Sequence, residues 1–223
     1  MISGGFTLNH LQFLLSGALW TICLSLIAFI GGGVAGGIVA LLRISSVAPV
    51  RWLAYAYVQL IQGTPLLVLL FVAYFGLSIA GLTLTGLAAA GIAMVIYVSA
   101  YLGEIWRGCI ESVARTQWEA AECLALSRAQ RMRLVILPQA ARIATPPTVG
   151  FMVQIVKNTS LASIVGFVEL VRAGQLINNS IFQPFLVYLL IAIFYFAMCY
   201  PLSVWSRKLE RRLQYGMRPA LSA

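Results

Sequence analysis

Long apolar segments alternate with short polar ones along the whole chain. Each apolar segment approaches or exceeds the ~20 residues that an α-helix needs, at 1.5 Å a residue, to cross a hydrocarbon core of ~30 Å. Because the core offers no water to backbone groups, such segments cross it as helices. The pattern predicts an all-α integral membrane protein, a single domain over residues 1–223 with five transmembrane helices at about 11–42, 52–78, 87–105, 146–168 and 184–205.

Composition supports this prediction and argues against other classes. Hydrophobic residues make up 61% of the chain and charged residues 9%, against roughly 25% charged in a soluble domain. The net charge of +9 comes from basic residues scattered at the ends of the apolar segments, which favours lipid headgroups over nucleic acid as partners. Asp is absent, His10 is the single histidine, and no Cys-x-x-Cys pair occurs, so neither a metal site nor a catalytic cluster is indicated.

The basic residues also predict the orientation. Lys and Arg are concentrated in three polar segments, 43–51, 107–142 and 207–218. Five spans place all three on one side of the membrane, which the positive-inside rule makes the cytoplasm. We therefore expect the N-terminus outside and the C-terminus in the cytoplasm. The first span is longer than the hydrophobic core of a cleaved signal, so we expect it to stay in the protein.

The second and fourth predicted spans contain polar residues near their middle. In Gln62-Gly63-Thr64-Pro65, the proline disfavours helix, so we expect a break with Thr64 as N-cap and Pro65 as first residue of a second half-helix. Transporters aim such half-helix N-termini at anionic substrate groups, although a proline kink without a ligand is the alternative. Lys157-Asn158-Thr159-Ser160 places an ionisable residue at membrane depth. Such residues mark functional sites by default, so both stretches are candidates for the substrate pathway.

Glu104, at the cytoplasmic end of the third span, is a further candidate for the substrate pathway. Its side chain can extend to the boundary between lipid and water, or it can pair with Arg107. Alternatively, it faces the interior of the bundle and binds a cation such as a substrate ammonium, or it pairs with Lys157 as a structural ion pair. The sequence leaves these three possibilities open.

The longest polar segment, about 106–143, predicts two short amphipathic helices. The first is expected at 118–126, and Ser127 can cap a second with Arg128, Arg131 and Arg133 mostly on one side, which Pro138 bends or ends. Such a knob fits a groove on another protein. A basic helix lying on the membrane surface is the alternative.

This segment resembles the cytoplasmic coupling loop of permease subunits of ATP-binding-cassette (ABC) importers. That loop reads Glu-Ala-Ala, three residues, Gly, nine residues, Ile, one residue, Leu-Pro. The corresponding residues here are Glu119, Ala120, Ala121, Ala125 in place of Gly, Val135 in place of Ile, Leu137 and Pro138. Because alanine adopts the positive φ available to glycine only at a cost, the sequence leaves the geometry of this turn open.

Two further stretches resemble permeases for polar amino acids. Ala100-Tyr101, two residues, Glu104, two residues, Arg107-Gly108 is similar to a run found in them. The residues from Lys157 to Leu161 are similar to a Lys-Asp-Thr-Ser-Leu pattern, with Asn158 in place of Asp and hence one negative charge fewer.

The resemblance covers nearly the whole chain. It implies a type I ABC importer permease fold in the bacterial cytoplasmic membrane, with substrate-pathway residues in the spans and ATPase coupling through Glu119–Pro138. The implied partners are a second permease subunit, two cytoplasmic ATPase subunits that bind ATP and Mg, and an extracytoplasmic amino-acid-binding protein. This chain would itself hold no cofactor and catalyse no reaction, and it contains no Gly-Lys-Ser/Thr phosphate-binding sequence. An ion-coupled secondary transporter is the alternative class, although it would ordinarily show a two-fold repeat and more spans.

Overall fold

The computed structural model describes residues 5–216, and every regular element among them is a helix. In chain order they are α1 (Leu8–Arg43), α2 (Ala48–Gln62), α3 (Leu66–Phe71), the π-helix η1 (Val72–Gly76), α4 (Leu77–Ile79), α5 (Gly86–Glu111), α6 (Arg115–Cys123), α7 (Arg128–Gln130), the π-helix η2 (Arg131–Ile136), α8 (Leu137–Asn158), the 3₁₀-helix η3 (Thr159–Val165), α9 (Leu170–Ile181) and α10 (Pro184–Gly216). Four helices are long and apolar enough to cross a membrane, and the bent stretch from α2 to α4 counts as a fifth span. The predicted all-α architecture is therefore confirmed.

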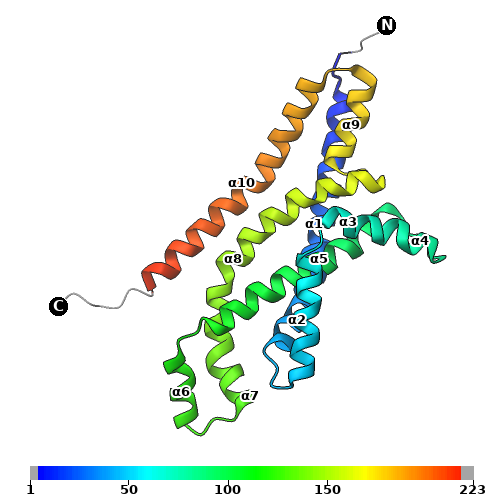
Figure 1. The fold of residues 1–223 in the computed structure, drawn as a ribbon. Coiled ribbons are helices and arrows are strands. Elements are labelled where there is room, and N and C mark those ends of the chain that lie inside the picture. The colour runs from blue at the N-terminus through cyan, green and yellow to red at the C-terminus, as the bar shows by residue number, and fades with distance from the viewer. Residues whose placement is uncertain (1–4, 217–223) are drawn as a thin grey trace.

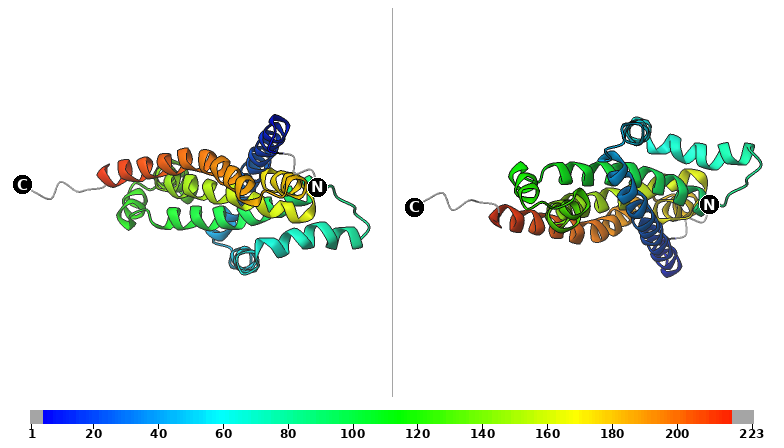
Figure 2. Two further views of the ribbon diagram at one scale, coloured as in Figure 1. Left: turned by 90° about the horizontal axis from the view of Figure 1, so that it is seen from above. Right: turned by 90° about the horizontal axis from the view of Figure 1, so that it is seen from below.

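The helices form a layer with an element projecting on each side. Figure 1 shows α9 and the start of α1 at one end of the molecule and α6 and α7 at the other. In Figure 2, α5, α8 and α10 lie together, while α1 and the α3–α4 stretch project on opposite sides of them. The helices at the α6 end extend beyond the apolar segments, which leaves a polar knob outside the lipid.

Glycines set the crossing of α1 over α5. A Cβ added to Gly36 would lie 3.1 Å from the Cβ of Leu102, and one added to Gly103 would lie 2.7 Å from Cγ1 of Val39. Larger side chains at these positions would push the helices apart, as expected for a small-residue interface between membrane helices. The close crossing brings Arg43, at the end of α1, alongside α5.

Three helix boundaries differ clearly from the predicted ones, and one of them is the end of the last helix, because α10 continues past 205 to Gly216. The third span does not end at residue 105, because α5 continues to Glu111. The fourth does not begin after Pro146-Pro147, because the helical run starts at Arg128 and passes through Pro138 and both later prolines. Pro138 is the second residue after the π-helix η2, and local π geometry accommodates proline in membrane helices. The hydroxyl of Ser206 in α10 donates to the carbonyl of Pro146 at 3.0 Å and joins the two helices.

The predicted break in the second span is confirmed, but its cap is not. The axes of α2 and of the helical stretch from Leu66 to Ile79 differ by 98°. Thr64 is not the N-cap, because its hydroxyl donates to the carbonyl of Leu60 at 2.7 Å and so belongs to the end of α2. Pro65 is the N-cap instead, with an extended ψ of 137°, and α3 begins one residue later than predicted.

Candidate coupling knob and transport pathway

A Schellman motif ends α6 and builds the turn of the knob. The N–H of Ala125 donates to the carbonyl of Glu122 at 2.9 Å, and the N–H of Leu126 donates to the carbonyl of Ala121 at 3.3 Å. Ala125 has φ of 54°, in the left-handed region that favours glycine. The turn therefore has the geometry that glycine allows, although alanine occupies the position.

Ser127 starts the second arm of the knob, as predicted. Its side chain accepts from the N–H of Gln130 at 3.4 Å, while the Gln130 side chain accepts from the N–H of Ser127 at 2.9 Å. This reciprocal pair is a capping box. The first arm begins at Arg115 and ends at Cys123, three residues earlier at each end than the predicted 118–126.

The motif residues divide into an inner and an outer set. Ala121 is buried, and Leu137 packs against the apolar cluster at the base of the knob that contains Ile110, Ile136 and Ala140. Outward-facing, exposed motif residues are Glu119, Ala120, Ala125 and Pro138. Leu124, beside them, is 73% exposed, so the outer face combines a carboxylate with apolar surface.

Polar contacts fix the two arms to each other and to the spans. Arg131 pairs with Glu122 at 3.1 Å, which joins η2 to α6. The Arg128 guanidinium donates to the carbonyl of Ile44 at 3.2 Å, which joins the second arm to the end of α1. The knob is thus tied to the end of the first span by one hydrogen bond.

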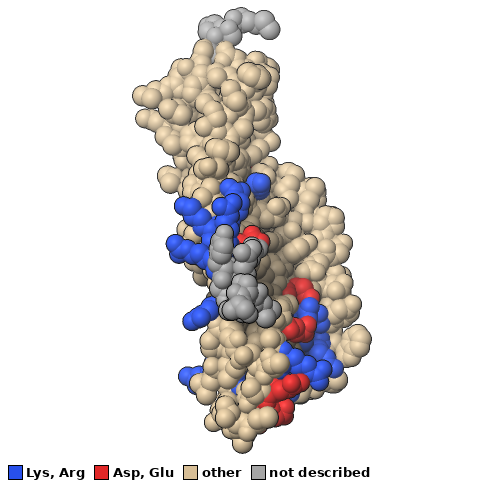
Figure 3. Space-filling view, turned by 90° about the vertical axis from the view of Figure 1, so that its left-hand side faces the viewer, with Lys and Arg blue, Asp and Glu red and all other residues tan. Residues whose placement is uncertain are grey.

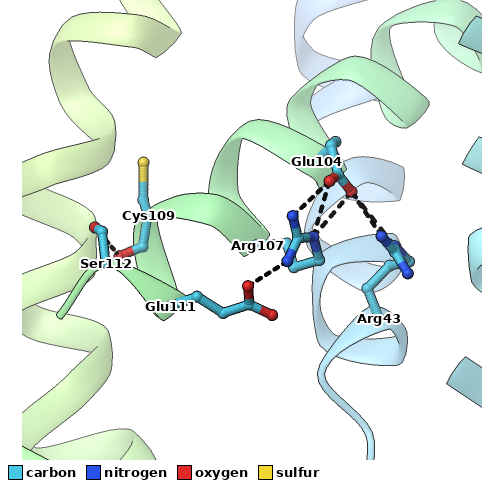
Figure 4. Close-up of polar contacts among 6 residues, drawn as sticks. All are labelled: Arg43, Glu104, Arg107, Cys109, Glu111 and Ser112. Atoms are coloured by element: carbon cyan, nitrogen blue, oxygen red, sulfur yellow. Dashed lines mark hydrogen bonds and ion pairs between the residues drawn. The ribbon is translucent and has the colours of Figure 1, made fainter. Parts of the chain in front are cut away.

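Glu104 lies at the centre of an ion-pair cluster (Figure 4). Its Oε2 accepts from Nη2 of Arg43 at 3.2 Å, and its Oε1 accepts from Nη2 of Arg107 at 2.6 Å. Arg107 also pairs with Glu111, and the Arg43 guanidinium lies 4.9 Å from the centre of the Tyr55 ring of α2. The cluster thus links α1, α2 and α5. Pairing with Arg107 is confirmed, whereas pairing of Glu104 with Lys157 is wrong, because Arg43 and Arg107 occupy the carboxylate.

The predicted polar turn in the fourth span lies where α8 tightens into η3. Lys157 is exposed, and within the described part of the chain no ion pair includes it. Thr159 is buried and its hydroxyl donates to a backbone carbonyl at 2.7 Å, as does that of Ser160. Asn158 accepts from the Gln154 side chain at 3.0 Å.

The break and the polar turn lie on neighbouring elements. Leu66 and Leu70 of α3 belong to the same core cluster as Ala162 and Val165 of η3. Gln62, Gly63, Thr64 and Pro65, at the break itself, are each at least partly exposed. The elements that follow the break and the polar turn thus pack in one core, whereas the Glu104 carboxylate is paired with Arg43 and Arg107.

Sequence reasoning missed an aromatic group beside the polar turn. The rings of Tyr97 and Tyr101 of α5 lie 4.4 Å apart, and that of Phe151 of α8 lies 5.6 Å from Tyr101. All three side chains are partly exposed, as is that of Asn158, which follows Phe151 on α8 by seven residues, or about two turns. The tyrosines at i and i+4 on one helix face were the available signal.

A second missed residue is Glu169, which is fully buried. Its carboxylate caps α9 by accepting from the N–H groups of Val171 and Arg172, each at 2.9 Å. The Tyr195 hydroxyl of α10 donates to it at 3.2 Å. This residue therefore joins α9 to α10 at the opposite end of the molecule from the knob.

Charge is unevenly distributed over the surface. Figure 3 shows Lys, Arg and Glu side chains over the lower and middle parts of one face, whereas the upper described part of that face carries none. A helical membrane protein with one charged end, a polar knob at that end and a broken span inside has the features expected of a membrane transport protein.

Comparison with known proteins defines the family. A model described as "Binding-protein-dependent transport system inner membrane component" matches residues 32–215. The probable glutamine ABC transporter permease protein GlnM of Bacillus subtilis (strain 168) is 38% identical over 206 residues, which cover 92% of this chain and 95% of the relative. The L-cystine transport system permease protein TcyB of the same organism is 39% identical over 202 residues, covering 90% of this chain and 86% of the relative.

Solved structures agree. A chain of an amino acid ABC transporter, crystallised with histidines, is 34% identical and superposes with a TM-score of 0.87, covering 92% of this chain and 95% of that chain. A chain of the inward-facing MetNI methionine ABC transporter is 18% identical with a TM-score of 0.79, covering 93% of this chain and 99% of that chain, and shares the fold. The protein belongs to the family of inner membrane components of binding-protein-dependent transport systems and is an ABC transporter permease. The secondary-transporter alternative is thereby set aside.

Proposed function

We propose that this permease imports a polar amino acid or a related small zwitterion across the bacterial cytoplasmic membrane. Relatives named for glutamine and for L-cystine match nearly the whole chain, which supports this substrate class. The permease acts with a second permease subunit, two cytoplasmic ATPase subunits and an extracytoplasmic binding protein. Its N-terminus lies outside and its C-terminus in the cytoplasm, in line with the basic residues near the knob.

The knob is the proposed contact with the ATPase, and its exposed outer face is the observation that carries this assignment. Glu119, Ala120 and Leu124 lie outward on one rigid helix, where a groove on a partner can receive them. Ala121 and Leu137 act indirectly by holding the arms together. ATP and Mg bind to the partner ATPase, which performs the hydrolysis.

The break from Gln62 to Pro65 and the turn from Lys157 to Ser160 are the proposed substrate pathway. A zwitterion needs a positive group for its carboxylate, and the exposed ammonium of Lys157 supplies one. The N–H of Val68 donates to the Pro65 carbonyl at 2.9 Å, so the amides between Pro65 and Val68, at the start of α3, are free. These free amides can add to the positive charge that Lys157 supplies. The amide-bearing side chains of Gln154 and Asn158 offer neutral acceptors for the ammonium. A role for Glu104 in binding that ammonium stays a prediction.

Reconstitution tests the proposal. The permease is placed in proteoliposomes with its ATPase, its partner permease and its binding protein, and a panel of amino acids is screened for ATP-dependent uptake. We expect uptake of a polar amino acid only when the ATPase and ATP are both present. Uptake that follows a proton or sodium gradient without ATP would contradict it.

A further inference from the structure

An apolar cleft of about 680 Å³ lies between α1, α5, α8 and α10, apart from the proposed pathway. This volume is within the roughly 300–1,000 Å³ of sites that hold small molecules. Its lining includes Phe29 and Gly37 of α1, Trp106 of α5, Met152 of α8 and Trp205 of α10. Figure 2 shows that α1 diverges from the layer that contains α8 and α10.

Three of the four side chains that bring an N–H or hydroxyl group to the wall are bonded within the protein, and the Trp205 indole is the fourth. The Trp106 indole N–H donates to the Thr148 hydroxyl at 2.8 Å, and the Thr145 hydroxyl donates to the Ala141 carbonyl at 2.8 Å. A polar solute entering the cleft would therefore lose its hydration and gain few hydrogen bonds, at a cost of several kcal/mol per unpaired group in water-free surroundings. The cleft suits a hydrocarbon chain and not the transported zwitterion.

The cleft is longer than the hydrocarbon part of one leaflet, so it has room for an extended acyl chain. Its lining on α8 extends from Leu137 to Met152, about 22 Å at 1.5 Å a residue. Half of a ~30 Å hydrocarbon core is ~15 Å. The Leu137 end adjoins the base of the knob, and a smaller apolar pocket of about 300 Å³ continues from Phe29 and Met152 at the other end.

Positive charge lies beyond the Leu137 end of the cleft, and at the far end Lys157 follows Val156, which lines the smaller pocket. Lys208 and Arg212 follow Trp205 by three and seven residues, so they lie on the same face of α10 one and two turns toward its C-terminus. Both are exposed, whereas Glu210 falls on a different face. At the Phe29 end the lining carries no charged residue.

From this combination we propose that the cleft binds an anionic phospholipid of the cytoplasmic leaflet, with one acyl chain along α8 and the phosphate at Lys208 and Arg212. Long basic side chains at helix ends contact headgroups in this way, and tryptophan is enriched at the same depth. A lipid without net charge would fill the cleft but would gain little attraction from Lys208 and Arg212 at its mouth. A helix from a second copy of the chain would need no paired cations there.

Lipid binding to the purified complex of permease and ATPase tests the proposal. After delipidation, the complex is titrated with phosphatidylglycerol or with phosphatidylcholine of the same chains, and bound lipids are counted by native mass spectrometry. We expect one phosphatidylglycerol per permease chain, bound more tightly than phosphatidylcholine. The double variant Lys208→Gln/Arg212→Gln should lower the affinity for phosphatidylglycerol about 30-fold, since each cation contributes about fivefold to that affinity.

Filling the cleft gives a second, independent readout. Ala141 is exposed and lines the cleft, so Ala141→Trp should abolish the tight site. Val34→Trp, at an exposed α1 position outside the lining, is the matched control and should bind normally. Equal affinity for the two lipids, or tight binding by a folded Ala141→Trp protein, would overturn the proposal. So would a cross-link between Ala141→Cys in the cleft and a second permease chain.

Discussion

Replacing Glu104 with glutamine removes the negative centre of the cluster that links α1 and α5. The glutamate is 29% exposed and its partners Arg43 and Arg107 are 11% and 21% exposed, so all three are shielded from water more than a surface pair. A hydrogen bond to a charged group contributes about 1.5–3 kcal/mol, and here both guanidinium groups lose one. Because glutamine keeps one acceptor oxygen, we expect the free energy of unfolding to fall by about 2–3 kcal/mol.

The measurement is denaturant unfolding of the purified permease in mixed micelles, with two controls from the same region. Glu111→Gln removes an exposed partner of Arg107 and should cost at most about 1 kcal/mol. The effects of Glu104→Gln and Lys157→Met should add within about 0.5 kcal/mol, because the two residues form no pair. A Glu104→Gln protein as stable as the wild type, or one whose stability Lys157→Met restores, would refute this reasoning.

Three further predictions concern the turn, the opposite end and the orientation. Ala125→Gly should raise the free energy of unfolding by about 0.5–1 kcal/mol, since glycine adopts φ of 54° without strain, and a loss in the same unfolding assay would contradict the turn assignment. Glu169→Ala should lower the free energy of unfolding by about 2–4 kcal/mol, because it removes the α9 cap and the acceptor of the Tyr195 hydroxyl. Glu169→Gln should lower it less, and equal losses would argue against capping. Single cysteines replacing Ser3 and Ser222, both outside the described residues, should react with an impermeant outer label only at Ser3, in a background lacking the native cysteines, and the reverse pattern would invert the topology.

Hydropathy and one proline were enough to predict the spans and the break. They did not place the helix ends, because the cost of a proline inside a helix depends on its neighbours. Pro138 follows a π-helix, which local sequence does not reveal. At the break, the Thr64 hydroxyl donates to the Leu60 carbonyl. A residue that could cap α3 therefore bonds to the end of α2 instead.

Side-chain partners were harder to predict than elements. The bond between Glu104 and Arg43 joins residues far apart in sequence, and it depends on the close crossing that Gly36 and Gly103 permit. Likewise, the motif alone did not separate Ala121, which is buried, from Ala120, which is exposed. That division decides which of the matched positions can contact a partner.

The most direct test of the proposed coupling changes the outer face of the knob and nothing beneath it. Glu119→Lys and Ala120→Asp alter exposed positions of α6, and Glu210→Lys reverses an exposed charge on α10 as the control. ATP-dependent uptake is measured in proteoliposomes that contain the complete transporter. We predict that both knob variants insert and fold but lose uptake, whereas Glu210→Lys transports normally. Normal uptake by Glu119→Lys and Ala120→Asp would contradict docking of the ATPase at this face.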